Sequence, residues 1–169
     1  AAAANNTFSI NGVINVPGGL RIADGVTAEI DGIRIQDGSS LQIDGTARIA
    51  SFTQTGGLVT GSGNLTLTGS SNQWVHGIWE GGGTSTVADG AVLDIQSYDE
   101  NSPRLQGRVL QVASGGLVNL GQLNVALGTS TINIDDGGTF NFAGANYYSN
   151  ILAIEGGILN LNNSGTINL

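Results

Sequence analysis

The sequence predicts an all-β fold, a single-chain parallel β-solenoid of about seven to eight short coils. A nine-residue pattern recurs at least six times along the chain. The composition also favours strands and tight turns, with 28 glycines, only two prolines and many Asn, Thr and Ser residues. The 169 residues are enough for one domain, so a single solenoid is expected over residues 1–169.

The repeated frame reads apolar, any residue, Asp or Ser, Gly, two small or variable residues, apolar, polar, apolar. One copy spans residues 87–95, and further copies begin at Ile22, Ile35, Val112, Ile134 and, one residue shorter, Ile154. The apolar-polar-apolar triplet places two side chains inward and one outward on a short strand. The Asp-Gly or Ser-Gly step turns the chain, because glycine adopts a positive φ without strain.

The spacing of the copies predicts the coil length. The starts at 87, 112, 134 and 154 are separated by 25, 22 and 20 residues, which corresponds to one coil each. The step from 22 to 35 is too short for a coil, so these copies are expected on successive faces of one turn; the step from 35 to 87 fits two coils. A sandwich of antiparallel hairpins is the alternative fold, since Asp-Gly is also a hairpin signal. The constant inward-outward phase of the copies favours the solenoid.

Charge and composition limit the partners. The net charge is −8, with five Arg and no Lys, which argues against nucleic acid and anionic membrane surfaces. No apolar run approaches the roughly 20 residues needed to span a bilayer, so no membrane insertion is expected. The absence of Cys excludes a disulfide framework, a thiolate metal site and a Cys nucleophile. The Ala-rich start and the lack of Met favour a processed, secreted chain with a flexible or processed segment at residues 1–6.

Several phrases in the middle of the chain resemble the repeats of large bacterial secreted surface proteins, of the filamentous-haemagglutinin-like and autotransporter-passenger kind. They lie between Gly57 and Phe142, at residues 58–69, 79–83, 86–95, 105–110 and 115–120. The resemblance covers about half of the chain, and it implies a parallel β-helix on a cell surface or in a matrix. It implies no catalytic residue, because those repeats are scaffolding. Such proteins are usually much longer, so we expect an excised segment or a compact subunit that polymerises.

A candidate contact site lies in residues 72–80, which hold the only His and both Trp residues. Exposed rings of Trp74 and Trp79 would stack on sugar faces, with His76 and Glu80 supplying hydrogen bonds. The alternative is that one or both Trp rings fill the core while His76 faces solvent. Tyr147 and Tyr148, in an expected loop near 144–150, are suited to a sugar or protein contact. A glycan-binding module is therefore the alternative function.

Acidic residues give weaker hypotheses. Asp99 and Glu100, in an expected loop near 97–104, are weak calcium candidates because calcium prefers oxygen ligands. Asp135 and Asp136 are the nearest approach to a paired carboxylate, but glycoside hydrolysis needs two carboxyls across a groove. A polysaccharide lyase or hydrolase is thus the less favoured alternative. We expect no enzyme activity, no cofactor and no firm metal site.

Both ends of the chain have strand-like sequences. A solenoid requires caps, since its terminal coils otherwise expose apolar ladders and unpaired amides, and no capping helix is visible. Either the chain is a segment of a longer rod, or its ends pair with neighbouring subunits. The predicted assembly contacts are Phe8, Ile10, Ile167 and Leu169. The leading hypothesis is an extracellular structural or adhesive module that self-associates end to end into a surface filament or biofilm-matrix fibre.

Overall fold

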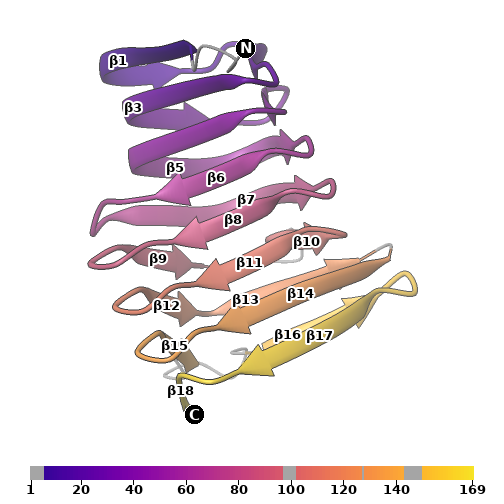
Figure 1. Ribbon diagram of the computed structural model, residues 1–169. Coiled ribbons are helices and arrows are strands. Elements are labelled where there is room, and N and C mark those ends of the chain that lie inside the picture. Colours follow the sequence, from indigo (N-terminus) through magenta and orange to yellow (C-terminus); the bar gives the residue numbers. More distant parts are fainter. Residues whose placement is uncertain (1–5, 97–101, 127, 143–149) are drawn as a thin grey trace.

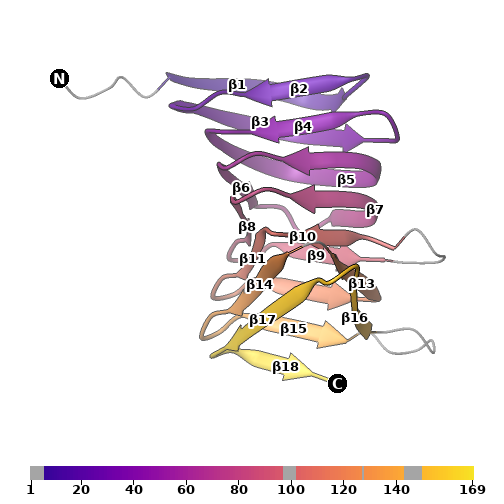
Figure 2. The ribbon, with the colours of Figure 1, turned by 90° about the vertical axis from the view of Figure 1, so that its right-hand side faces the viewer.

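The computed structural model describes residues 6–96, 102–126, 128–142 and 150–169. At residue 150 and residues 152–154 it describes the backbone alone. These residues form strands and turns, and they contain no helix. Every strand pairing among them is parallel. The predicted parallel β-solenoid is therefore confirmed, and the hairpin sandwich is wrong. Its coils stack into one rod with the two ends of the chain at opposite ends (Figures 1 and 2).

The strands form three ladders, which we call faces A, B and C. Face A contains the first parts of β1 (Asn6–Asn15), β3 (Val26–Ile35) and β5 (Thr46–Thr60), then β6 (Asn64–Leu67), β8 (Thr84–Val87), β11 (Val109–Val112), β14 (Thr129–Ile134) and β17 (Ile158–Asn163). Face B contains later parts of the same long strands, then the start of β7 (Asn72–Glu80), β9 (Val92–Ile95), β12 (Leu117–Leu120), β15 (Thr139–Phe142) and β18 (Thr166–Asn168). Face C contains β2 (Gly19–Ile22), β4 (Ser40–Ile43), the ends of β5 and β7, β10 (Arg104–Gln106), β13 (Gln122–Ala126) and β16 (Asn150–Ile154).

The core consists of apolar columns that run along the rod. Strands β9, β11 and β12 alternate half-buried and buried residues, as the apolar-polar-apolar triplets predict. Parallel register places each inward residue on its equivalent in the next coil, as with Leu93, Val118 and Phe140. These three side chains are at most 2% exposed. Burying one Leu or Val side chain contributes about 1.5–3 kcal/mol, so the columns are the main source of stability.

The Asp-Gly frame forms the tight turns, and glycine has a positive φ in each. The Ala91 amide donates to the Ala88 carbonyl at 3.0 Å, and Gly90 between them has φ +70°. An equivalent turn follows β11, where the Gly116 amide donates to the Ala113 carbonyl. This is the β-turn geometry that requires glycine at its third position.

The frame does not mark one corner throughout the rod. Val87, Val112 and Ile134 stack in register between faces A and B, so the spacings of 25 and 22 residues are confirmed as coils. Ile22 and Ile35 end β2 and β3 on different faces, so the short step does lie within one turn. The extension of the series to Ile154 is wrong, because Ile154 ends β16 on face C.

The structure corrects two further expectations about the frame. The residue one coil after Ile134 is Asn163, where the sequence predicted Ile154. The 52-residue step from 35 to 87 joins two different corners, since Ile35 ends a strand on face B and Val87 ends one on face A.

Arg104, placed by the sequence in a loop, begins strand β10. No helix of the described residues is long and apolar enough to cross a membrane.

Candidate functional site

Trp74 and Trp79 lie inside the solenoid. Both side chains are 0% exposed, and their rings stack with centroids 4.2 Å apart and an interplanar angle of 9°. Phe52 contacts Trp79 edge-on at 5.6 Å. The Trp79 indole N–H donates to Oε1 of the buried Gln54 at 2.6 Å. This aromatic cluster fills the core at the level of β5 and β7.

The burial of both rings corrects the expected sugar-stacking surface. A sugar needs an exposed ring face, and neither Trp offers one. His76 is half-buried on β7, beside the cluster in sequence. Tyr147 and Tyr148, as well as the calcium candidates Asp99 and Glu100, lie outside the described residues. The structure therefore assembles no aromatic binding face from the residues it describes.

Arg108 is the residue that the sequence analysis missed. Its side chain is 0% exposed. Its guanidinium donates to the Ser85 hydroxyl at 2.8 Å and to the carbonyls of Gly61 and Gly63 at 3.1 Å each. Longer bonds reach the carbonyls of Glu80 and Thr84. One side chain thus satisfies acceptors in two preceding coils and ties three coils together.

The hydrogen-bond partners of Arg108 are neutral groups, so burial determines the pKa of its guanidinium. Burial lowers the pKa of the guanidinium to about 10, so Arg108 stays protonated at neutral pH. Glycine makes room for it: a Cβ on Gly83 would lie 2.8 Å from Nη1 of Arg108. A sequence signal could have identified Arg108. Successive coils have glycine at one position, and the next coil has a long side chain at that same position.

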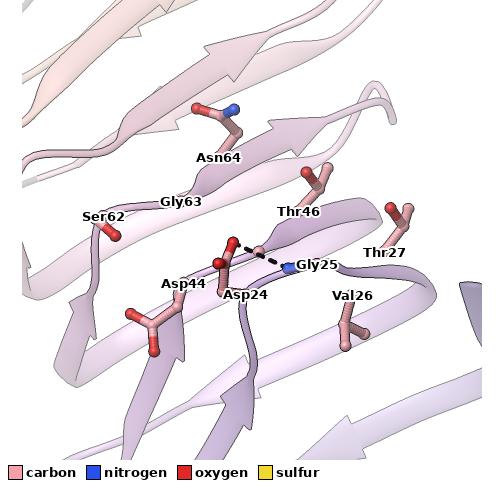
Figure 3. Close-up of a pocket in the computed structure, with 10 residues that line it drawn as sticks. Asp24, Gly25, Val26, Thr27, Asp44, Thr46, Ser62, Gly63 and Asn64 are labelled. Carbon is pink, nitrogen blue, oxygen red and sulfur yellow. Dashed lines mark hydrogen bonds between the residues drawn. The ribbon is translucent and has the colours of Figure 1, made fainter. Parts of the chain in front are cut away.

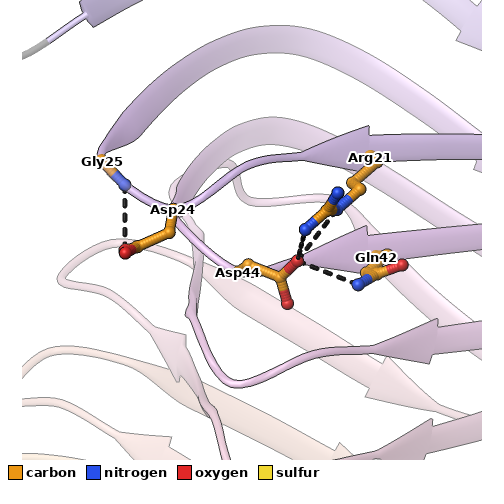
Figure 4. Close-up of polar contacts among 5 residues, drawn as sticks. All are labelled: Arg21, Asp24, Gly25, Gln42 and Asp44. Atoms are coloured by element: carbon orange, nitrogen blue, oxygen red, sulfur yellow. Dashed lines mark hydrogen bonds and ion pairs between the residues drawn. The ribbon is translucent and has the colours of Figure 1, made fainter.

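A polar groove of about 420 Å³ lies at the corner between faces C and A (Figure 3). Residues 24–27, 44–46 and 62–64 of three successive coils line it. Its two carboxylates already have partners. Asp24 accepts the amide of Gly25 at 2.9 Å, and Asp44 accepts bonds from Arg21 and Gln42 (Figure 4). Asp24 therefore stabilises its turn, and Asp44 binds side chains on the surface.

The described residues contain no group of three or more His, Cys, Asp or Glu side chains that could hold a metal ion. Asp135 and Asp136 lie on an exposed turn after β14, and Asp135 accepts a bond from Gln111 at 2.6 Å. The adjacent carboxyls therefore face solvent on a turn and do not oppose each other across a groove.

Two ladders of side-chain amides run along the outside of the C-terminal coils. On face B, Asn168 donates to Asn141, Asn141 donates to Asn119, and Asn119 donates to Asp94, at 2.6, 3.0 and 2.8 Å. On face A, Asn162 donates to Asn133 and Asn133 donates to Gln111. Each Asn in these ladders donates toward the N-terminal end of the rod, whereas Gln111, which ends the face A ladder, donates to Asp135 in the following coil. The two series therefore have a direction.

The end coils differ from the rest of the rod. The exposed large apolar side chains of the described residues are Phe8, Val13, Ile158, Leu161 and Leu169, with exposed fractions from 39% to 100%. All five belong to β1, to β17 or to the last residue of the sequence. Ile10 and Ile167 are half-buried and pack against the core. Of the predicted assembly contacts, Phe8 and Leu169 are thus exposed at the ends.

The chain matches no protein-family model, and searches of curated proteins and of solved structures found no match either.

Proposed function

We propose that this chain is an extracellular structural or adhesive β-solenoid module whose coils stack end to end, in a surface filament or a biofilm-matrix fibre. The observation that carries this proposal is where apolar surface is exposed. Every exposed large apolar side chain of the described residues lies in β1, in β17 or at the last residue of the sequence. A surface whose apolar side chains gather at two opposite ends favours contacts along the rod axis.

The strand edges support the same direction of growth. Among the described strands, β1 pairs with β3 alone, β17 with β14 alone and β18 with β15 alone. One edge of each of these strands therefore presents amide and carbonyl groups to solvent. Such edges are templates for further strand pairing, and adding a coil would satisfy them.

The extracellular setting rests on composition and on the resemblance to secreted repeats. Charged residues make up 11% of the sequence, and the outward columns are rich in Thr and Asn. Stacked polar side chains of this kind form ladders along a β-stack. The repeats that residues 57–142 resemble occur as scaffolds of bacterial surface proteins.

Concentration-dependent assembly of the purified chain tests this function. We expect sedimentation velocity and negative-stain microscopy to show rods that lengthen with concentration. We also expect Phe8→Glu and Leu161→Glu to abolish lengthening, because each places a charge in the end-coil contact. Thr86→Glu is the matched control: it adds the same charge on an outward position of a middle coil, and its rods should lengthen normally.

Circular dichroism of each variant verifies that the solenoid is folded. Strictly monomeric wild-type particles at high concentration would contradict the proposal. Equal loss of assembly in Thr86→Glu would also contradict it, since the effect would then come from net charge and not from the ends.

A further inference from the structure

The first and last coils have the same corner between faces A and B. In the first coil, face A ends at Ile10 and face B begins at Val13. In the last coil, face A ends at Asn163 and face B begins at Thr166. Each corner therefore advances by three positions, from 10 to 13 and from 163 to 166.

The coils that neighbour the two ends do not share this corner length. In β3 the corresponding step runs from Ile30 to Gly32, and the register with β1 shifts there by one residue. Between β14 and β15 it runs from Ile134 to Thr139. The two end coils thus match each other better at this corner than either matches its own neighbour.

We propose that the rod grows head to tail in one register, in which the last coil of one copy pairs with the first coil of the next. This inference rests on the proposed function and specifies its junction. On face A, β17 pairs in parallel with β1 of the second copy, so that Asn162 lies beside Ser9. On face B, β18 pairs with the later part of the same β1, so that Asn168 lies beside Asn15. Faces A and B carry this junction, and β16 and β2 do not pair in it.

The inward side chains in this register are complementary. Leu161 lies beside Phe8, and Ile167 lies beside Ile14. Leu161 and Phe8 are 47% and 39% exposed, while Ile167 and Ile14 are half-buried against the core. Stacking would bury all four side chains in the same way as Leu93, Val118 and Phe140 bury one another in the middle of the rod.

Charge favours the junction as well. The sequence has no Asp, Glu, Lys or Arg between residues 6 and 20 or between residues 156 and 169. The net charge of −8 is therefore carried by side chains away from the two surfaces that meet. Repulsion between copies opposes lateral contacts more than end-to-end contacts.

The direction of the amide ladders selects head to tail over head to head. Asn168 and Asn162 use their Nδ2 groups to donate toward the N-terminal end of their own copy. Their Oδ1 atoms are the next acceptors in each series. A following coil supplies donors in the same sense, with Asn15 reaching Asn168 and Ser9 reaching Asn162. Two C-terminal ends facing each other would bring acceptor against acceptor.

Disulfide cross-linking tests the register, because the chain has no cysteine of its own. Directly paired strands lie about 4.8 Å apart, within the Cα separation of about 4.4–6.8 Å that a disulfide requires. Oxidation of an equimolar mixture of Ser9→Cys and Asn162→Cys chains should give a covalent heterodimer. Thr7→Cys mixed with Asn162→Cys is the off-register control, with a diagonal separation of about 7–8 Å. We expect at least a tenfold lower dimer yield from it.

Each single-cysteine chain oxidised alone tests the opposite polarity. Dimers of Asn162→Cys with itself, or of Ser9→Cys with itself, would show that like ends meet and would overturn the head-to-tail junction. Rods that lengthen while the Ser9→Cys and Asn162→Cys mixture gives no dimer would overturn the register and leave end-to-end growth intact. Chains that stay monomeric and give no dimer in any mixture would overturn the proposed function itself.

Discussion

In the N-terminal coils, residues 6–60, the strands β1, β3 and β5 each run from face A onto face B without a tight turn. In the C-terminal coils, residues 84–169, faces A and B are separate short strands, and tight glycine turns follow β8, β11 and β14. The inward columns nevertheless continue from one part to the other. Parallel stacking thus demands a constant inward column and leaves the corner free to vary in length.

The outward columns differ between the same two parts. The N-terminal coils pair charges across neighbouring strands, with Arg21 on Asp44 at 2.8 Å and Arg48 on Glu29 at 3.3 Å. The C-terminal coils pair neutral amides in directional series. The stacked Trp rings lie between the two parts, and Arg108 of the C-terminal coils donates back to the carbonyls of Gly61 and Gly63. Exposed ion pairs contribute little, so the two parts are expected to respond differently to comparable substitutions.

The largest difference is expected between a buried and an exposed arginine. Arg108→Met should lower the free energy of unfolding by about 3–5 kcal/mol, because it removes a buried cation and leaves several buried acceptors without a donor. Arg48→Met, on an exposed ion pair of the N-terminal coils, should lower it by no more than about 1 kcal/mol. Urea denaturation followed by circular dichroism measures both. Similar losses for the two variants would show that Arg108 does not hold the coils together.

The next largest difference in stability is expected between the two kinds of corner. Gly90, in a tight turn of the C-terminal coils, has φ +70° and open space around its Cβ position. Gly90→Ala should therefore lose about 1–2 kcal/mol, the penalty for a left-handed conformation alone. Gly32, at the corner of the N-terminal coils, lacks a positive φ, and the atoms nearest to a Cβ there belong to the exposed Val13, with its Cγ2 at 2.9 Å. Gly32→Ala should change stability by less than about 0.5 kcal/mol.

Thermal and urea unfolding of the two glycine variants distinguish the corners. If Gly32→Ala is as damaging as Gly90→Ala, the continuous strand of the N-terminal coils depends on glycine as much as the turn does. The proposed contrast between the two corner types would then be wrong.

The parts of this fold that depend on local chemistry could be predicted from the sequence. The alternation in residues 92–95 and the glycine at position 90 determine a short strand and a turn by themselves. Coil spacing was predictable wherever the turn kept one corner, as from Val87 to Ile134. The predicted spacing was wrong at Ile154, because the same turn occurs there at another corner of the coil. The local sequence pattern does not show at which corner a turn lies.

Side-chain burial depended on neighbours that are far away in sequence. Trp74 and Trp79 are close along β7, and their pattern suits a surface as well as a core. Their burial follows from Phe52 and Gln54 one coil earlier. Arg108 was missed for the same reason, since its acceptors at Gly61 and Gly63 lie more than forty positions away. The exposed end coils were predictable, because they follow from the repeat itself.

The smallest difference is expected between two outward positions of the same column on face B. Asn119, in the C-terminal coils, donates to Asp94 and accepts from Asn141. Asn119→Ala should lower the free energy of unfolding by about 1 kcal/mol, since water replaces part of both hydrogen bonds. Arg34, the equivalent residue of the N-terminal coils, is exposed, and Arg34→Ala should stay within about 0.5 kcal/mol of wild type.

A double-mutant cycle between Asn119→Ala and Asn141→Ala decides whether the amides act as a series. The two residues occupy directly paired strands, so a coupling of about 0.5–1 kcal/mol is expected if each amide stabilises the next. Additive losses would mean that each amide interacts mainly with water. The C-terminal coils would then depend, like the N-terminal coils, on their inward columns alone, and the direction of the ladders would lose its role at the ends of the rod.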